Sequence, residues 1–359
     1  MGAAKRNDIQ WLRALAAIEV VLWHSDLVTK HFSTVAFQLS SYRLLGGMGV
    51  ELFFIISGYV ICLQSPRYRT ALSFLYARYA RLLPMYWIFT SLVVLVYFLN
   101  PSWRLGSFDL GPTTYIKSYL ILPQYKDPIL GVGWSLEHEV IFYVAVASLI
   151  GVGFGSIVRQ HLTLAVALGA LGVIGLALAT GPQPLIWDFQ ISSPYMLLFA
   201  FGWTMCCIHQ RYINPRGALI ALTCTGLIAL LVAAPKEQML AVRIVLLAAV
   251  FATFVSARSL LERDTILNRA VSSIADASYS LYLSHWFILS ALGKVLGVLK
   301  IPPGLDIPAR LAALAACILC ALVIFRYIEK PIDQLLRPRQ AQNKSPAAVG
   351  PAAYPNSGE

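Results

Sequence analysis

Long apolar runs, separated by short polar connections, recur along almost the whole chain. A transmembrane helix needs about 20 predominantly apolar residues, and Pro and Gly mark several gaps between runs of about this length. The predicted helices cover residues 9–28, 46–64, 82–99, 134–154, 161–180, 192–210, 217–234, 239–257, 277–297 and 309–328. The pattern predicts an all-α fold, a polytopic membrane helix bundle of about ten transmembrane helices.

Composition agrees with a protein that is embedded in a bilayer. Hydrophobic residues make up 58% of the chain and charged residues 13%, about half the charged share of soluble domains. The net charge of +11 raises nucleic acid as a partner. However, the basic residues lie mostly in short connections, where they set topology. We therefore expect no nucleic-acid binding and an integral, multi-pass protein of the cytoplasmic (inner) membrane.

The distribution of Lys and Arg predicts the orientation. With a cytoplasmic N-terminus, 17 of the 28 Lys and Arg face the cytoplasm, ten face the opposite side, and Arg13 lies within the first run. This excess favours an N-in, C-in topology. The longest connections are then a basic one at 65–81 inside and an aromatic-rich one at 100–133 outside. Residues 1–337 are expected to form one membrane domain, followed by a disordered polar tail at 338–359.

The first run contains two ionisable residues that could carry chemistry. Arg13 and His24 are eleven residues apart, close to three helical turns, which places them on nearly the same face of a helix, about 16 Å apart along its axis. One interpretation is that Arg13 reaches the headgroups and His24 ends the helix. The other is that both line a buried pathway in which His24 acts as a base, because a neutral imidazole accepts a proton near neutral pH.

Two further groups allow a structural and a functional interpretation. Ser57 and Gly58, in the interior of the second run, are typical of close helix packing in membranes. Arg78 and Arg81 lie three residues apart at the mouth of the third run. They could anchor the helix, or they could bind phosphate, since the Arg fork matches phosphate oxygens.

Polar residues also enter the fourth and ninth predicted helices. Glu139 follows His138 and is the deepest carboxylate of the fourth helix, so it is the candidate partner for a buried cation. We expect no metal there, because neighbouring positions on a helix direct ligands apart. Tyr279, Tyr282 and His285 recur every three residues and share a face, which fits either an interfacial aromatic belt or the lining of a cavity. The six cysteines lie in or beside apolar runs and are interpreted as small buried side chains.

Six of these segments, in order, resemble the acyltransferase family 3 membrane enzymes, in particular the branch that acetylates exopolysaccharides. The segments cover nearly the whole membrane portion: IQWLRALAAIEVVLWH, GVELFFIISGY, RYARLLPMYW, GWSLEHEVIFY, SYSLYLSH and RYIEKPI.

The resemblance implies roles for individual residues. His24 is expected to be catalytic, with Arg13 also required and Glu139 orienting the histidine. Glu51 stands where the family usually has Asp. The expected acyl-CoA-binding residues are Arg78, Arg81, Ser57 and Tyr59. The expected residues of the pocket or acceptor site are Glu51, Trp134, Ser135, Tyr279, Tyr282 and His285.

The expected function is that of a membrane-bound O-acyltransferase without a bound cofactor or metal. It would move an acyl group, acetyl by resemblance, from cytoplasmic acyl-CoA (acetyl-CoA) to a hydroxyl of an extracytoplasmic or lipid-linked carbohydrate such as exopolysaccharide or O-antigen. Tyr279, Tyr282 or Arg13 would stabilise the oxyanion, and proteins of polysaccharide assembly are expected partners. The alternative is a multi-span transporter or flippase of a polysaccharide pathway.

Overall fold

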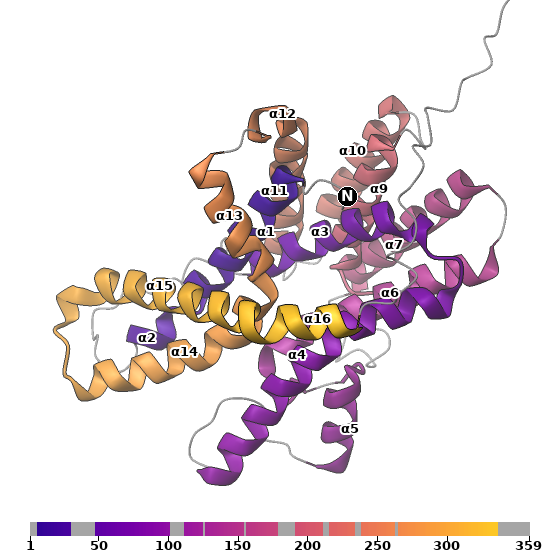
Figure 1. Ribbon diagram of the computed structural model, residues 1–359. Helices are drawn as coiled ribbons and strands as arrows, with labels where there is room; N and C mark the ends of the chain where they lie inside the picture. Colours follow the sequence, from indigo (N-terminus) through magenta and orange to yellow (C-terminus); the bar gives the residue numbers. More distant parts are fainter. Residues whose placement is uncertain are drawn as a thin grey trace, which may run out of the picture.

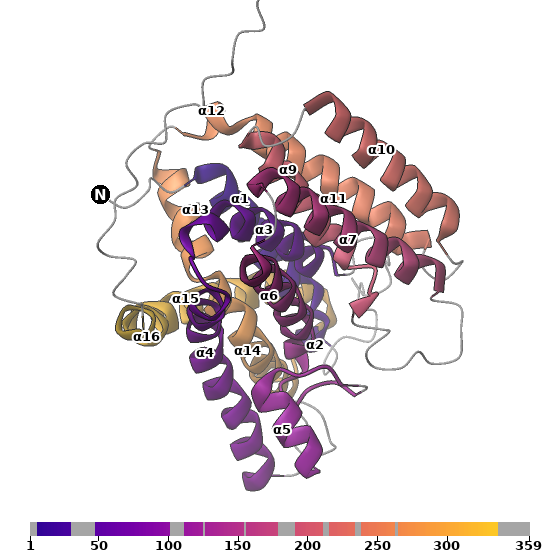
Figure 2. The ribbon, with the colours of Figure 1, turned by 90° about the vertical axis from the view of Figure 1, so that its right-hand side faces the viewer.

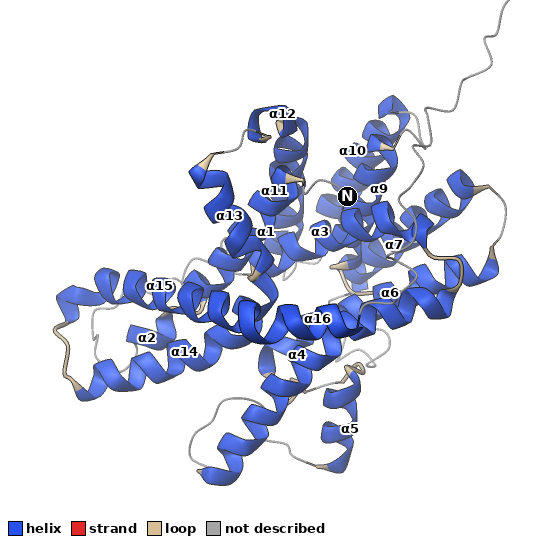
Figure 3. Ribbon diagram, viewed as in Figure 1, coloured by secondary structure: helices blue, strands red, loops and turns tan. Residues whose placement is uncertain are grey.

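The computed structural model describes residues 6–29, 47–100, 111–124, 126–153, 156–178, 191–210, 215–233, 238–262 and 265–336, and these residues form helices and connections without a strand (Figures 1 and 3). The predicted all-α class is confirmed. The helices are α1 (Asn7–Trp23), α2 (Asp26–Thr29), α3 (Met48–Gln64), α4 (Ala71–Leu99), α5 (Pro112–Leu120), α6 (Trp134–Val152), α7 (Ile157–Leu178), α9 (Met196–His209), α10 (Pro215–Val232), α11 (Gln238–Ser256), α12 (Arg258–Leu261), α13 (Ile266–Asp276), α14 (Ser278–Val298), α15 (Asp306–Ile324) and α16 (Lys330–Leu336).

Each of the ten apolar runs contains a helix, but fewer of these helices qualify as membrane spans. Within the described chain, seven segments are long and apolar enough to cross a membrane: Met48–Arg67, Ala71–Leu99, Gly131–Val152, Val158–Ala177, Gln238–Ser256, Ser278–Val298 and Asp306–Leu336. α1 has 17 residues and α9 has 14, so they extend about 26 Å and 21 Å, less than the ~30 Å of a bilayer core. The expected count of about ten is not confirmed, and the N-in, C-in orientation stays a prediction.

The outer helices carry large exposed apolar side chains. Leu95 and Phe98 of α4 and Leu319 and Val323 of α15 are all more than half exposed. Water would not favour such a surface, whereas lipid tails would, because they are as apolar as these side chains. The exposed faces therefore agree with an integral, multi-pass membrane protein.

The centre of the bundle is the crossing of α3 and α9. Figure 2 shows α3 among α1, α6, α9 and α11. A Cβ atom at Gly58 would overlap the backbone carbonyl of Phe199, and one at Gly202 would overlap that of Ile55. Both glycines thus allow the two backbones to touch, as small residues do in membrane bundles. This contact fixes α3, which carries part of the cavity described below.

Replacing Gly202 with leucine should disrupt the crossing of α3 and α9, because the new side chain would enter the backbone of α3. We expect a large loss of correctly folded protein, measured by detergent size-exclusion chromatography and thermal unfolding. Gly169→Leu is the matched control on α7, where a Cβ atom meets nothing within 4 Å among the described residues. Equal yield and thermal stability of the two variants would contradict the assignment.

The basic connection expected at 65–81 is largely helical, which corrects its interpretation as a loop. α4 begins at Ala71 because the side-chain oxygen of Thr70 accepts a hydrogen bond from the backbone N–H of Ser73 (3.2 Å), the usual cap of a helix start. Arg78 and Arg81 therefore lie on α4, one turn apart on one face. Their guanidinium groups are positioned by a regular helix rather than by a loop.

The aromatic-rich connection at 100–133 also contains structure. α5 covers Pro112–Leu120, and a short 3₁₀ turn at Gly131–Gly133 leads into α6. At the other side of the bundle, α2 lies between α14 and α15 (Figure 1). The predicted tail at 338–359 lies outside the described residues.

Candidate active site

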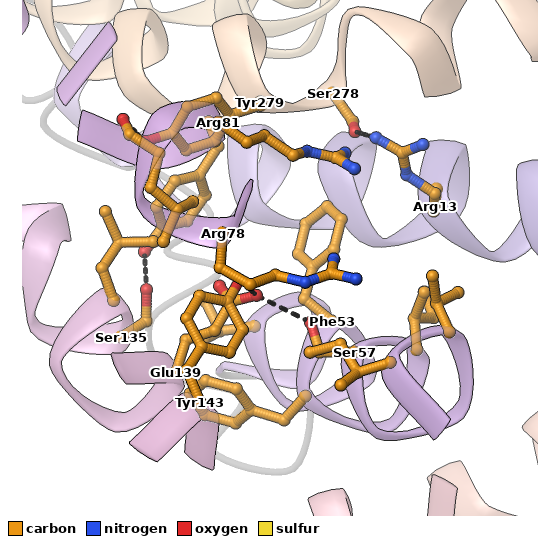
Figure 4. A pocket seen from close by; sticks show the side chains of 18 of the residues that line it. Arg13, Phe53, Ser57, Arg78, Arg81, Ser135, Glu139, Tyr143, Ser278 and Tyr279 are labelled. Carbon is orange, nitrogen blue, oxygen red and sulfur yellow. Dashed lines mark hydrogen bonds between the residues drawn. The ribbon is translucent and has the colours of Figure 1, made fainter. Parts of the chain in front are cut away.

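A cavity of about 260 Å³ lies between α1, α3, α4, α6 and α14 (Figure 4). Eight of the residues predicted from the sequence line it: Arg13, Ser57, Arg78, Arg81, Ser135, Glu139, Tyr279 and Tyr282. The other five predicted residues are not part of its lining: His24, Glu51, Tyr59, Trp134 and His285. The tertiary structure thus gathers residues from five helices that are far apart in the sequence, as expected for ligand sites within helix bundles.

Arg78 lies in an aromatic cage beside the cavity. Its guanidinium carbon is 5.3 Å from the ring centre of Phe74 and 6.0 Å from those of Tyr68 and Tyr143, a distance typical of cation–π contacts. Nη2 donates a hydrogen bond to Oε1 of Gln64 (2.6 Å). Nε is buried and has no hydrogen-bond partner among the described residues. Because an unpaired buried donor costs about 1–3 kcal/mol, this N–H is suited to an acceptor atom of a ligand.

Two more arginines face the same space. In Figure 4 the side chains of Arg78 and Arg81 run side by side toward the side where Arg13 lies. Arg13 donates from Nη2 to the hydroxyl of Ser278 (2.8 Å). Among the described residues, three arginines and one carboxylate, Glu139, line the cavity, so this lining carries an excess of positive charge. Such a lining attracts an anionic ligand.

A second carboxylate, Glu329, lies behind this lining and was not assigned a role from the sequence. It accepts hydrogen bonds from the backbone N–H (3.2 Å) and the hydroxyl of Ser280. It also interacts electrostatically with Arg81 and Arg13. Glu329 ends a π-helical segment, Phe325–Glu329, an irregularity that often accompanies functional sites. The sequence feature that could have indicated Glu329 is its place in the RYIEKPI segment, as a carboxylate at the end of an apolar run.

Glu139 points into the cavity, but it does not orient His24 as expected. Its Oε1 accepts hydrogen bonds from the hydroxyls of Ser57 (3.1 Å) and Tyr143 (2.5 Å). The bond from Ser57 connects α6 to α3, the bond from Tyr143 lies within α6, and together they hold the carboxylate beside the cage of Arg78. The expectation that Glu139 positions the imidazole of His24 is therefore corrected, because the ring of His24 contacts the carbonyl of Val20 and the ring of His285 instead.

The tyrosines of α14 form one end of the cavity. The hydroxyl of Tyr282 donates to the backbone carbonyl of Val132 (2.6 Å) and lies 2.7 Å from the hydroxyl of Ser135. The hydroxyl of Tyr279 donates to the carbonyl of Leu82 (2.8 Å). The hydroxyl hydrogens of both tyrosines are therefore engaged in hydrogen bonds to backbone carbonyls. Behind Tyr282, its ring centre 6.0 Å away, lies the ring of His285.

His24 and His285 form a pair beyond this end of the cavity. Nε2 of His285 lies 3.2 Å from Nδ1 of His24. Nδ1 of His285 contacts the carbonyl of Tyr282 (2.6 Å), and Nδ1 of His24 contacts that of Val20 (2.9 Å). A carbonyl only accepts, so both Nδ1 atoms carry hydrogen, and the one hydrogen on Nδ1 of His24 is shared between the nearer carbonyl of Val20 and Nε2 of His285. Nε2 of His24 is then the nitrogen with a free lone pair.

The turn that follows His24 is held by a buried arginine that the sequence analysis did not single out. Arg310 of α15 is 5% exposed. It donates to the hydroxyls of Ser25 (2.8 Å) and Thr29 (2.9 Å) and to the carboxylates of Asp26 (2.6 Å) and Asp306 (2.8 Å). The clamp, defined as Arg310 with these four partners, ties the chain directly after His24 to α15.

Three predicted residues lie elsewhere in the bundle. Glu51 accepts two hydrogen bonds from Arg243 of α11 (2.6 and 3.2 Å). The hydroxyl of Tyr59 accepts from Arg6, and its ring centre is 5.5 Å from that of Phe251. Trp134 packs in an aromatic cluster with Phe54, His138 and Tyr195. The structure therefore brings none of the three to the cavity, and their predicted roles in binding stay predictions.

Comparison with known proteins identifies the family to which this helix bundle belongs. The family model of the acyltransferase domain Acyl_transf_3 matches residues 6–326. The chain belongs to this family and is a membrane acyltransferase, which confirms the expected enzyme class over the transporter or flippase. It is also 25% identical over 360 residues to the exopolysaccharide production protein ExoZ of Rhizobium meliloti (strain 1021), covering 93% of this chain and 100% of the relative. No solved structure matches.

Proposed function

We propose that this acyltransferase moves an acyl group, acetyl in the first instance, from acyl-CoA to a hydroxyl of a carbohydrate such as exopolysaccharide or O-antigen. The similarity to a protein of exopolysaccharide production supports the acceptor class. One observation carries the proposal. The arginine-rich cavity ends at Tyr282, and the histidine pair with one free lone pair follows directly.

The donor is expected to bind with its charged part on the arginines. A volume of about 260 Å³ is below the roughly 300–1,000 Å³ of pockets that enclose a drug-sized ligand. The cavity would therefore hold only part of acyl-CoA, and the rest of the donor would extend beyond it. The phosphates would meet Arg78 and Arg81, because Arg forks bind phosphate oxygens in pairs, and the thioester would lie toward Tyr282.

The transfer itself needs one base. Nε2 of His24 would take the proton of the acceptor hydroxyl, and the oxygen would attack the thioester carbonyl carbon. The C–O bond forms and the C–S bond breaks, so that coenzyme A leaves as a thiolate and takes the proton from the His24 imidazolium. His285 would support this cycle, because its Nε2 would share the Nδ1 hydrogen of His24 with the Val20 carbonyl in both the neutral and the charged state.

Of the three residues expected to stabilise the oxyanion, Arg13 has the most hydrogen-bond donors without a partner in the described contacts. The hydroxyls of Tyr279 and Tyr282 donate to the carbonyls of Leu82 and Val132. Arg13 uses one N–H on Ser278 and has four more. Arg13 lies about 16 Å along the helix axis from His24, so its remaining N–H groups would bind an anionic part of the donor, and an oxyanion role for any of the three stays a prediction.

The proposed topology gives the two substrates separate routes. In the N-in orientation the start of α4, with Arg78 and Arg81, faces cytoplasmic acyl-CoA. The turn after His24 then faces the opposite side of the inner membrane, from which the carbohydrate would enter. Polysaccharide-assembly proteins would deliver it there.

An assay of the purified protein tests the proposal. The protein in detergent or liposomes is mixed with labelled acetyl-CoA and an oligosaccharide acceptor, and free coenzyme A thiol and labelled sugar are measured. We expect equal amounts of both products, which depend on the acceptor. If the protein transfers acetyl groups to another class of hydroxyl compound but to none of the carbohydrates offered, the proposed acceptor class is rejected. No release of coenzyme A with any acceptor would reject the donor.

Replacing Arg78 with glutamine should weaken donor binding. Charge-assisted hydrogen bonds contribute about 1.5–3 kcal/mol, so KM for acyl-CoA should rise about ten- to hundredfold, with a smaller change in kcat. Arg69→Gln is the matched control, because Arg69 is exposed in the connection before α4. An unchanged KM in Arg78→Gln would contradict the assignment of Arg78 to the donor.

A further inference from the structure

Three metal-binding side chains from three helices meet away from the cavity, where α3, α7 and α9 pack together. Cys62, His161 and Cys207 are all buried, and one potential ligand atom of each lies within 4.8 Å of the other two. Sγ of Cys62 is 3.7 Å from Nδ1 of His161 and 3.9 Å from Sγ of Cys207. We call these three residues the thiol–imidazole cluster. Single buried cysteines usually serve as small apolar groups, but here three ligand atoms converge on one point.

The spacing of these atoms agrees with a tetrahedral zinc site. Zinc binds cysteine sulfur at about 2.3 Å and histidine nitrogen at about 2.0–2.1 Å. In a tetrahedral site these bond lengths place two sulfur atoms about 3.8 Å apart, and a sulfur and a nitrogen about 3.5 Å apart. The two distances at Cys62 therefore need to change by only a few tenths of an ångström.

The position of His161 is fixed by its neighbour Trp203. The indole Nε1 donates to the backbone carbonyl of His161 (3.1 Å), and the two ring centres are 5.0 Å apart. The contact holds the backbone of His161 and packs one face of the imidazole, so that the ring stays directed at the thiols. Such orientation of a histidine by surrounding groups is typical of metal sites.

Charge selects the kind of cation. Two cysteine thiolates and one neutral imidazole carry a charge of minus two, so a divalent cation makes the unit neutral. Neutrality is important, because an uncompensated charge is expensive in a buried, low-dielectric place. A monovalent thiophilic ion such as Cu⁺ would leave one negative charge. Thiolate and imidazole ligands together suit zinc.

We propose that Cys62, His161 and Cys207 bind one Zn²⁺ ion. On binding, the S–H bonds of both thiols break, two S–Zn bonds form, and two protons leave to solvent. A water molecule completes the tetrahedron, because Cys206, the neighbour of Cys207 on α9, is not among the converging side chains. The ion joins the ends of α3, α7 and α9. Because Gln64, two residues after Cys62, holds Arg78, the zinc site stabilises one wall of the cavity.

Metal analysis of the full-length protein in detergent tests the proposal. After purification with Zn²⁺ in the buffers and removal of loosely bound metal, we expect about one zinc per chain. Cd²⁺ added to zinc-free protein should produce the ultraviolet thiolate-to-metal charge-transfer band. Cys62→Ser and Cys207→Ser, which nearly preserve side-chain volume, should lose both signals. The exposed cysteine variants Cys224→Ser and Cys320→Ser are matched controls that should keep them.

Several outcomes would overturn the proposal. The first is wild-type protein that binds neither Zn²⁺ nor Cd²⁺, and the second is a Cys62→Ser/Cys207→Ser double variant that retains zinc in full. The third is binding of copper in preference to zinc, and the fourth is a Cys62–Cys207 disulfide in freshly purified protein. The wild-type cadmium titration depends on no variant, so misfolding of a variant leaves the test intact. None of these measurements depends on acyl transfer.

Discussion

Acyl transfer by the His24→Ala variant is expected to fall about 10²–10⁴-fold in kcat, the usual contribution of a general base. The physical reason is the arrangement of the histidine pair, which leaves Nε2 of His24 as the nitrogen that can accept a proton. Radiolabelled acetyl transfer by purified protein measures the loss, and membrane fractionation with thermal unfolding shows whether the variant is inserted and folded.

The histidine pair offers a finer test of the same idea. In His285→Gln the side-chain oxygen can still accept from Nδ1 of His24, whereas in His285→Leu it cannot. We therefore expect Gln to retain more activity than Leu. His209→Gln, at an exposed histidine at the end of α9, is the matched control and should transfer acetyl groups at the wild-type rate. Full-rate transfer by folded His24→Ala protein would end the assignment of His24 as the base.

Replacing Arg310 with glutamine is expected to lower kcat about 10²-fold while KM for acyl-CoA stays unchanged. The clamp of Arg310 fixes the turn that directly follows His24, and a shift of about 1 Å in a catalytic group can cost a factor of this size. Loss of the guanidinium also leaves the carboxylates of Asp26 and Asp306 with less compensation. The melting temperature should therefore fall as well, since breaking a buried ion pair costs about 3–5 kcal/mol.

A double-variant comparison separates positioning from general destabilisation. If Arg310 acts through His24, then Arg310→Gln should cause little further loss in the His24→Ala background. Arg310→Lys keeps the charge and should restore part of the rate and of the stability. Arg258→Gln, which removes an exposed ion pair with Glu262, is the control and should change neither. An equal fold-loss with and without His24 would show that Arg310 does not position the histidine.

Much of the architecture could be predicted because the bilayer imposes a simple rule. Backbone polar groups in lipid must be satisfied within a helix, so each long apolar run had to become helical, and all ten did. The number that cross the membrane was harder to predict. α1 carries Arg13 and Glu19 and is too short for a full span on its own, and its place in the bundle depends on neighbours that hydropathy does not identify.

The residues of the candidate site could be predicted where a sequence motif contained them. The contacts between residues of distant helices could not. Arg13, Arg78, Arg81 and Glu139 were found from motifs and line one cavity. Glu139 was matched to the wrong partner, because its distance to His24 depends on how α6 packs against α1. For the same reason nothing in the local sequence indicated that Arg310 would reach Asp26.

By itself, the sequence determined the elements of this protein and its inventory of polar groups, because helix formation in an apolar run depends on residues that are near each other in the chain. Only the tertiary structure decided that His24 is paired with His285, that Arg78 is enclosed by aromatic rings, and that Cys62 meets His161 and Cys207. These contacts depend on how helices pack that are distant in the sequence. The meeting of Cys62 with Cys207, for example, follows from the close approach at Gly58 and Gly202, where the absence of two side chains sets how α3 and α9 cross.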